Sequence, residues 1–264
     1  MDKIKTIIEK EWAEVFKNRL VLFTVIFLPL FFTALSLIIL VLVGSGDSTE
    51  ATMDTADMPE QFARGVCQGI GGADCLQVFI GSQFMVMFML LPVLIPVTIA
   101  SYSIVGEKTT RSLEALLATP ITTIQLLVGK GLAAAIPAVV ATWLGFAIYM
   151  VGTALVSNSS VFGRLFGPLW LLAILVLGPL LAVLAVALAV MVSSRVSDPR
   201  VAEQLSAVVV IPIVLFMLGQ TAGFIVLNTQ IILLLVPIFV LIDAGLTYLA
   251  VKTFERENIL TRWK

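Results

Sequence analysis

The chain consists of long apolar blocks separated by short polar segments. Six blocks are long enough to form helices that cross the hydrocarbon core of a membrane, which takes about 20 residues each. These blocks lie at residues 20–43, 78–105, 132–156, 165–192, 205–227 and 229–251. The last two are separated only by Asn228 and its neighbours, so we expect a tight helical hairpin there. The pattern predicts an all-α membrane protein with six transmembrane helices.

The segment before the first block has helical periodicity of a different kind. Its apolar residues recur every three or four positions, with charged residues between them: Ile4, Ile7, Ile8, Trp12, Val15 and Phe16. This pattern is typical of an amphipathic helix that lies in the plane of the lipid headgroups. We therefore predict an amphipathic interfacial helix at 1–19 and a six-span transmembrane domain at 20–264. The helix either anchors the first span or docks a partner, and the pattern leaves both roles open.

Composition agrees with a membrane setting, and the charge distribution predicts an orientation. Apolar residues make up 59% of the chain and charged residues 12%, whereas soluble domains average about 25% charged residues. With the N-terminus in the cytoplasm, every Lys and Arg except Arg64 and Arg164 falls on the cytoplasmic side, in keeping with the positive-inside rule. We expect a multi-pass protein of the cell inner (cytoplasmic) membrane with both termini cytoplasmic. The net charge of −1 argues against a nucleic-acid partner, and the lack of histidine removes His-based catalysis and most metal sites.

One external segment, predicted at 44–77, forms a small extracytoplasmic loop. It contains Cys67 and Cys75, the two cysteines of the chain, eight positions apart in a glycine-rich stretch. Paired cysteines are common in oxidising compartments, so we expect a disulfide that closes a small loop. Two free thiols are the main alternative, and a soft metal site is disfavoured because no His or third Cys lies nearby.

A short charged segment at 106–120 follows the second predicted span. Its apolar stripe at helical spacing is formed by Leu113, Leu116 and Leu117. Pro120 ends this helix, because the residue before a proline is pushed out of the helical conformation. A second helix begins after Thr122, where Thr122 and Gln125 fit a capping box. We expect a helix, a break and a new helix at the cytoplasmic face, a shape that a soluble partner could bind.

Residues of this segment resemble a known family. The similarity is to the ABC-2 permease family, especially its sodium-export-like and multidrug-export-like branches, and is carried by Gly106-Glu107-Lys108, Arg111-Ser112-Leu113-Glu114, Leu116-Leu117, Thr119-Pro120 and Gly129-Lys130. Ser112 stands where the family usually has Thr. The resemblance extends to residues 198–205 and 254–260 and covers nearly the whole chain.

The resemblance implies a function and a set of partners. Members of the family pair as two permease subunits, in a homodimer or a heterodimer, and each docks one cytoplasmic ABC ATPase through short coupling helices. The chain is then the membrane-spanning permease subunit of an ATP-binding-cassette exporter, with ATP and Mg bound by the partner ATPase and no cofactor of its own. A non-conducting scaffold or regulatory subunit that docks an ATPase is the alternative. The chain has no Gly-x-x-x-x-Gly-Lys-Ser/Thr motif, so we expect a transport subunit that is not itself an enzyme.

The same resemblance implies which residues couple the chain to its ATPase. The main coupling element is expected at Glu107, Lys108, Arg111, Glu114, Leu117 and Pro120. A second contact is expected before the fifth span, at Arg195 and Arg200.

Asp243 is the one ionisable residue well inside a predicted span. Intramembrane acids usually face protein or water, so Asp243 is a candidate for cation binding or proton relay. The alternative is a carboxyl group that hydrogen-bonds near the cytoplasmic border. An intramembrane aspartyl protease would need a second aspartate in a span. The substrate stays open between hydrophobic or amphipathic cargo, which the apolar spans favour, and a cation such as sodium.

Overall fold

The computed structural model describes residues 2–44, 62, 64, 66–70, 72–109, 121–225 and 227–253. Within these residues every regular element is a helix. Six helical segments are long and apolar enough to cross a membrane: Val21–Gly44, Gly72–Thr109, Thr123–Val156, Ser159–Ser193, Pro199–Thr221 and Thr229–Thr253. Each overlaps one predicted block, so the prediction of an all-α membrane protein with six spans is confirmed.

Several of these spans are built from more than one helical element. In chain order the elements are α1 (Asp2–Val15), α2 (Arg19–Gly44), α4 (Gly72–Phe88), α5 (Leu91–Thr109), α7 (Thr123–Val156), α8 (Ser159–Leu165), α9 (Pro168–Leu172), η2 (Ala173–Leu177), α10 (Gly178–Ser193), α11 (Pro199–Ser206), η3 (Ala207–Val209), α12 (Val210–Thr221) and α13 (Thr229–Thr253). The α4–α5 span is interrupted because Pro92 has no N–H to donate to the carbonyl of Phe88. The fourth span contains a π-helical turn, η2, directly before Gly178 and Pro179.

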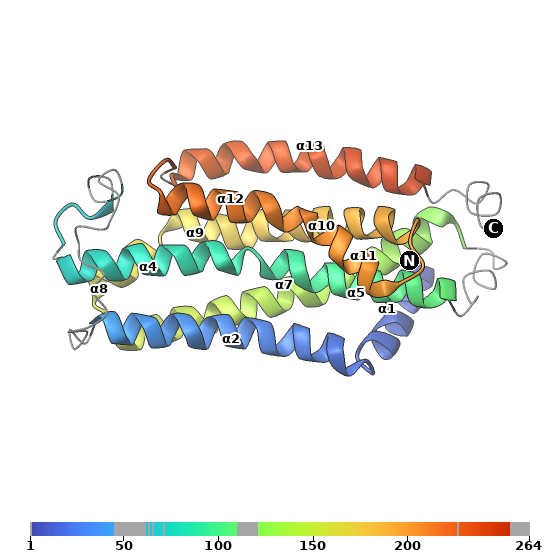
Figure 1. Cartoon of the computed structure of the whole chain (residues 1–264), viewed down its shortest axis with the longest axis horizontal. Helices are drawn as coiled ribbons and strands as arrows, with labels where there is room; N and C mark the ends of the chain where they lie inside the picture. The colour runs from blue at the N-terminus through green and yellow to red at the C-terminus, as the bar shows by residue number, and fades with distance from the viewer. Residues whose placement is uncertain are drawn as a thin grey trace.

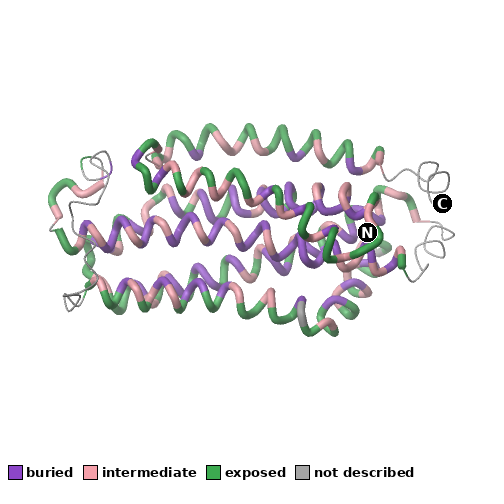
Figure 2. The backbone as a smooth tube through the Cα atoms, in the orientation of Figure 1, coloured by how far each residue is buried: buried purple, intermediate pink, exposed green. Residues whose placement is uncertain are grey.

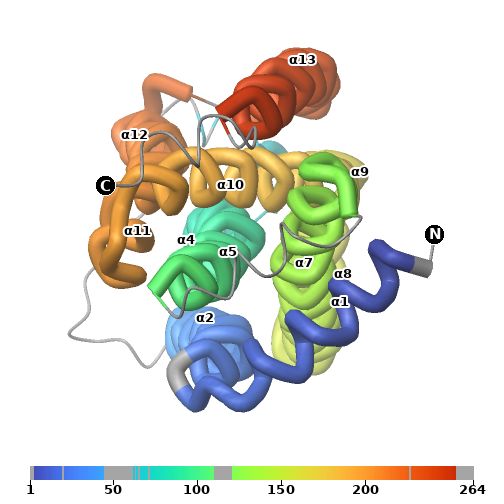
Figure 3. Tube along the Cα trace, turned by 90° about the vertical axis from the view of Figure 1, so that its right-hand side faces the viewer, coloured from blue at the N-terminus to red at the C-terminus, as the bar shows by residue number. Residues whose placement is uncertain are grey.

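The α4–α5 span forms the centre of the bundle. Seen from the end in Figure 3, it is surrounded by α2, α7, α10 and α11–α12, and α13 lies outside α10. The most apolar stretch of α4–α5 is 83% buried, against 11% for α13, and Figure 2 shows the same contrast along the two helices. Exposed apolar side chains of α13, such as Leu241, are therefore free to face lipid.

The first helix and the last one end at the same side of the bundle. Figure 1 shows α1 at an angle to the spans, at the same end of the bundle as the C-terminal end of α13. The N-terminal end of α4 and the short helix α8 lie at the opposite side. This layout gives the molecule two distinct ends, one with α1 and one with α8 and the start of α4.

The loop predicted at 44–77 is shorter in the structure. Helix α2 continues to Gly44, and α4 begins at Gly72, where Asp74 in the first turn is favourable for the helix dipole. Cys75 therefore lies in a helix. The structure joins Cys67 and Cys75 in a disulfide with a Cα–Cα distance of 5.3 Å, within the usual range for such bridges.

The third span also begins earlier than predicted. The Thr122 hydroxyl accepts a hydrogen bond from the Gln125 N–H, and the Gln125 side chain accepts one from the Thr122 N–H, each at 3.2 Å. The predicted capping box is therefore confirmed. Since α7 is continuous from Thr123, Gly129 and Lys130 lie inside a helix that is longer than the apolar block.

The fifth span differs most from its prediction at 205–227. It starts earlier, at Pro199, because the Asp198 side chain caps the helix with a backbone hydrogen bond of 2.8 Å. It also ends earlier, at Thr221, and Gly223 has a φ of 78° that reverses the chain toward α13. The connection is therefore longer than the tight hairpin that was expected.

Candidate functional site

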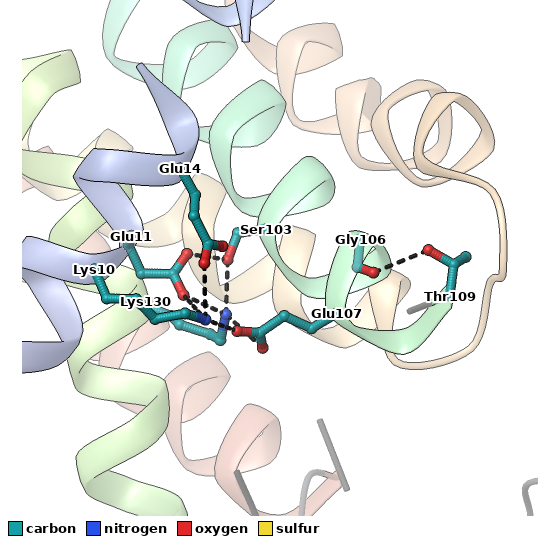
Figure 4. Close-up of polar contacts among 8 residues, drawn as sticks. All are labelled: Lys10, Glu11, Glu14, Ser103, Gly106, Glu107, Thr109 and Lys130. Carbon is teal, nitrogen blue, oxygen red and sulfur yellow. Dashed lines mark hydrogen bonds and ion pairs between the residues drawn. The ribbon is translucent and has the colours of Figure 1, made fainter. Parts of the chain in front are cut away.

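Four charged side chains gather where α1 meets α5 and α7. They are Lys10 and Glu11 of α1, Glu107 of α5 and Lys130 of α7 (Figure 4). The Lys130 Nζ lies 2.7 Å from Glu11 Oε1 and 2.7 Å from Glu107 Oε2. Lys130, Glu11 and Glu107 are each at most 5% exposed, so these ion pairs are closed to solvent. We call the four residues, together with Ser103, the charged cluster.

Each carboxylate of the charged cluster has more than one partner. The Ser103 hydroxyl donates to Glu11 Oε2 and accepts from the Lys130 Nζ at 2.8 Å. The Lys10 Nζ donates to Glu107 Oε1 and lies 3.7 Å from Glu11 Oε1. Two carboxylates thus face two ammonium groups, which is the compensation that buried charges require.

The contacts of the cluster favour the ionised forms of the two α1 residues. Burial alone would raise the pKa of the Glu11 carboxyl, but the Lys130 ammonium and the hydrogen bonds from Lys130 and Ser103 outweigh burial and hold that pKa below its ordinary value. Burial also opposes the charge of Lys10. The hydrogen bond to Glu107 and the surrounding carboxylates nevertheless raise the pKa of Lys10. Both residues are therefore charged at neutral pH.

The sequence of α1 places Glu11 on the face that packs against α7. Glu11 is four residues after Ile7 and four before Val15, and all three side chains are buried. Gly129 of α7 leaves room for this face of α1, because a Cβ added to Gly129 would lie only 2.7 Å from the Cγ2 of Ile7. The Trp12 Nε1 donates to a backbone carbonyl of α7 at 3.0 Å. Helix α1 is thus docked on the bundle as well as being amphipathic.

Sequence reasoning missed Glu11 and the pairing role of Lys130. The available signal was a carboxylate inside an apolar stripe of helical spacing, which would need a buried partner. That Asp243 is the one ionisable residue well inside a span stays a prediction. Glu107 and Lys130 also lie within helices long enough to cross the membrane, because α5 and α7 extend beyond the blocks that apolarity alone delimits.

The structure places the first two predicted coupling residues in different surroundings. Glu107 lies inside the charged cluster and is 5% exposed. The Lys108 Nζ donates to the backbone carbonyls of Ser194, at 3.3 Å, and Val196, at 3.0 Å. Lys108 thus joins the end of α5 to the connection between α10 and α11.

The remaining predicted residues are not part of the charged cluster. Two of them are exposed, one in the α10–α11 connection and one in α11: Arg195 and Arg200. Four lie outside the described residues: Arg111, Glu114, Leu117 and Pro120. Asp243 is buried on α13. A role of the six arginine, glutamate, leucine and proline residues in coupling, and of Asp243 in cation binding or proton relay, stays a prediction.

The charged cluster connects the two helices that flank the segment 110–120. Helix α5 ends at Thr109, just before this segment, and α7 begins at Thr123, just after it. Glu107 and Lys130 join these helices to each other, and Glu11 adds α1.

Comparison with known proteins gives the family of the chain. The sequence matches none of the curated proteins compared with it. A family model described as "ABC-2 family transporter protein" matches residues 5–258. This match includes most of α1, all six spans and the whole charged cluster, and it does not specify a branch of the family. Since nearly the entire chain is matched, the protein belongs to the ABC-2 family of transporter proteins.

Proposed function

We propose that the chain is the membrane-spanning permease subunit of an ABC exporter and couples ATP hydrolysis by a separate ATPase subunit to substrate export. Membership of the ABC-2 family and the six spans support this function. The single observation that carries it is the buried charged cluster, which joins α1 to the two helices that precede and follow the segment 110–120 in the sequence, α5 and α7. A scaffold that only docks an ATPase needs an exposed contact surface. It does not need that surface to be tied to three helices through buried ion pairs.

In this proposal the coupling residues have two different roles. Residues of the segment 110–120 and the exposed Arg195 and Arg200 touch the ATPase. Glu107 acts from inside the protein, where its ion pair with Lys130 transmits movement of the segment to α7 and α1. Lys108 links the same movement to the α10–α11 connection, which contains the second proposed contact. When ATP closes the ATPase dimer, these links would tilt several spans at once.

The assembly consists, on this proposal, of two permeases and two ATPases, and the ATPases bind the ATP and Mg. Both termini are cytoplasmic, and the protein lies in the cell inner membrane. Two features of the fold support this orientation. Helix α1 and the end of α13 lie at one side of the bundle (Figure 1). The Cys67–Cys75 disulfide follows α2 and precedes most of α4, at the other side, where an oxidising compartment would maintain it.

The test is co-purification of the tagged permease with its ABC ATPase in detergent, followed by measurement of ATP hydrolysis by the complex. Glu114→Lys changes a proposed contact and should release the ATPase. Glu107→Gln removes one charge from the buried cluster, so the ATPase should be retained, and its regulation by the permease should be lost. Glu9→Gln is the matched control, because Glu9 is on the exposed side of α1. It should behave like the wild type.

Two results would overturn the proposal. One is a wild-type permease that retains no ATPase under any condition. The other is a Glu107→Gln variant whose complex is regulated just as the Glu9→Gln complex is, since the cluster would then transmit nothing.

A further inference from the structure

Asp243 is a buried acid with unsatisfied hydrogen-bonding capacity. The residue is 6% exposed. Both of its carboxylate oxygens are inaccessible to solvent, and neither has a hydrogen-bond partner among the described residues. Carboxylates in such surroundings are unstable as free ions and need a proton or a cation to neutralise them. Of the described residues of α10 and α13, Asp243 is the one acid.

Two apolar cavities flank Asp243 along α13. One, of about 180 Å³, lies between α7, α10 and α13, and Thr247 is part of its wall. The other, of about 210 Å³, lies between α10, α12 and α13 with contributions from α4 and α9, and Phe239 is part of its wall. Phe239 and Thr247 are each four residues from Asp243, one turn before and one turn after it. Residues at this spacing share a helix face, so Asp243 lies between the two cavities along α13, on the face that packs on the bundle, and is part of neither wall.

The sizes of the cavities limit what could fill them. An apolar cavity of about 150 Å³ is known to hold one benzene molecule, so each cavity has room for roughly one ring or a short alkyl group. Phe239 and Thr247 are separated by about 12 Å along the helix, at 1.5 Å per residue. A matching molecule would carry its charge near the middle and one apolar group on each side.

The first cavity can be reached from the bilayer. Three of its wall residues are also partly exposed on the outer surface of the bundle: Val128, Leu132 and Val183. Amphiphilic cations concentrate in membranes, and the least buried span, α13, forms one wall of both cavities. A bare metal ion fits less well. It would need several oxygen ligands, and the described residues contain no group of three or more acidic, Cys or His side chains.

We propose that α13 carries a binding site for an amphiphilic organic cation, with the cationic nitrogen at Asp243 and one apolar group in each flanking cavity, and that this chemical class is the exported substrate. The substrate assignment rests on the proposed function. The binding site itself rests on Asp243 and the two cavities. Charge complementarity selects the cation, and the apolar walls select its substituents.

The test uses the purified permease, without ATPase, in nanodiscs of zwitterionic phosphatidylcholine. The probe is bis(3-phenylpropyl)dimethylammonium, which has one ring on each side of a permanently charged nitrogen and linkers long enough to reach both cavities. Its carbon isostere, 4,4-dimethyl-1,7-diphenylheptane, has the same shape and no charge. Calorimetry measures the affinity of each compound for the wild type and for Asp243→Asn, which keeps the shape of the side chain. Asp74→Asn is the matched control, because Asp74 is in the first turn of α4 and is part of neither cavity wall.

The expected result is that Asp243→Asn loses affinity for the charged probe and not for the uncharged one. Asp243→Asn should weaken binding of the cation by about tenfold or more, because opposite charges attract strongly where water is excluded. Asp74→Asn should leave the affinity for the cation unchanged. The uncharged isostere should bind Asp243→Asn and the wild type with equal affinity. Equal affinity of the cation for wild type and Asp243→Asn, or no binding to either, would overturn the site.

A second measurement separates this proposal from the function on which it rests. The ATPase is added to the permease, and hydrolysis is recorded with the cation and with the isostere. Stimulation by the cation that Asp243→Asn abolishes supports the substrate assignment. Selective binding without any stimulation overturns that assignment. Loss of the ATPase from the wild-type permease would overturn the proposed function and leave the binding result intact.

Discussion

Replacement of Lys130 by methionine should destabilise the protein strongly. The Lys130 Nζ is the shared partner of Glu11 and Glu107, at 2.7 Å from each, and the side chain is 3% exposed. Methionine fills most of the space but leaves two buried carboxylates beside one ammonium, that of Lys10. Removal of one partner from a buried ion pair typically costs about 3–5 kcal/mol. Lys10 offsets part of this loss, so we expect a value near the lower limit, about 3 kcal/mol.

Thermal unfolding of the purified permease in detergent measures this loss. At about 2–4 °C per kcal/mol for a chain of this size, Tm should fall by about 6–12 °C. Lys5→Met is the control on α1, because the Lys5 side chain is 78% exposed and pairs only loosely with Glu9, at 3.8 Å. Exposed pairs of this kind contribute at most about 1 kcal/mol.

A second substitution tests whether the buried carboxylates cause the loss. Adding Glu11→Gln to Lys130→Met removes one of the unpaired charges, so the double variant should be more stable than Lys130→Met alone. The reasoning would be refuted by equal Tm values for Lys130→Met and Lys5→Met. It would equally fail if Glu11→Gln brought no recovery in the Lys130→Met background.

Acid, steric bulk and reduction each test a different contact. In the folded protein the pKa of Glu11 lies below its ordinary value of 4.5. The ionised Glu11 carboxylate therefore stabilises the protein above pH 4.5, and this stabilisation is lost as the pH falls through the folded pKa. The Tm of the wild type and of Glu11→Gln should differ at neutral pH and become equal in acid. Gly129→Val should displace α1 from α7 and speed amide hydrogen exchange in α1. Gly245→Ala should leave that exchange unchanged, because a Cβ added to Gly245 meets no atom within 4 Å. Cys67→Ser should lower the free energy of unfolding by about 2–3 kcal/mol. Reduction of the disulfide in the wild type should lower its Tm to that of Cys67→Ser.

The number and type of the spans could be predicted because a segment that crosses a membrane must be a long apolar helix, and long apolar segments are visible in the sequence. The limits of the spans could not be predicted as well, because they depend on local backbone contacts. Asp198 and Pro199 start the fifth span before its apolar block. Gly223 turns the chain just after the end of that span, in a conformation that favours glycine. A window of apolar residues contains none of this information.

The charged cluster was harder to predict than the spans. Glu11 and Lys130 are 119 positions apart, and their ion pair exists only because α1 docks on α7. A helical pattern places Glu11 on the apolar face of α1, but it does not identify the partner. Glu107 was selected through the family resemblance as a contact for a partner protein. The structure buries it instead, a distinction that depends on tertiary packing.

The cluster also explains why the two short motifs of the resemblance occur together. Gly106-Glu107 ends the span before the segment 110–120, and Gly129-Lys130 lies in the helix after it. Gly129 gives α1 the space to approach α7, and Lys130 then reaches both Glu11 of α1 and Glu107 of α5. A larger residue at 129 would move α1 away from Lys130 and leave that ammonium with fewer partners. The glycine and the lysine are thus two parts of one interaction, and substitutions at the two positions should be non-additive in stability.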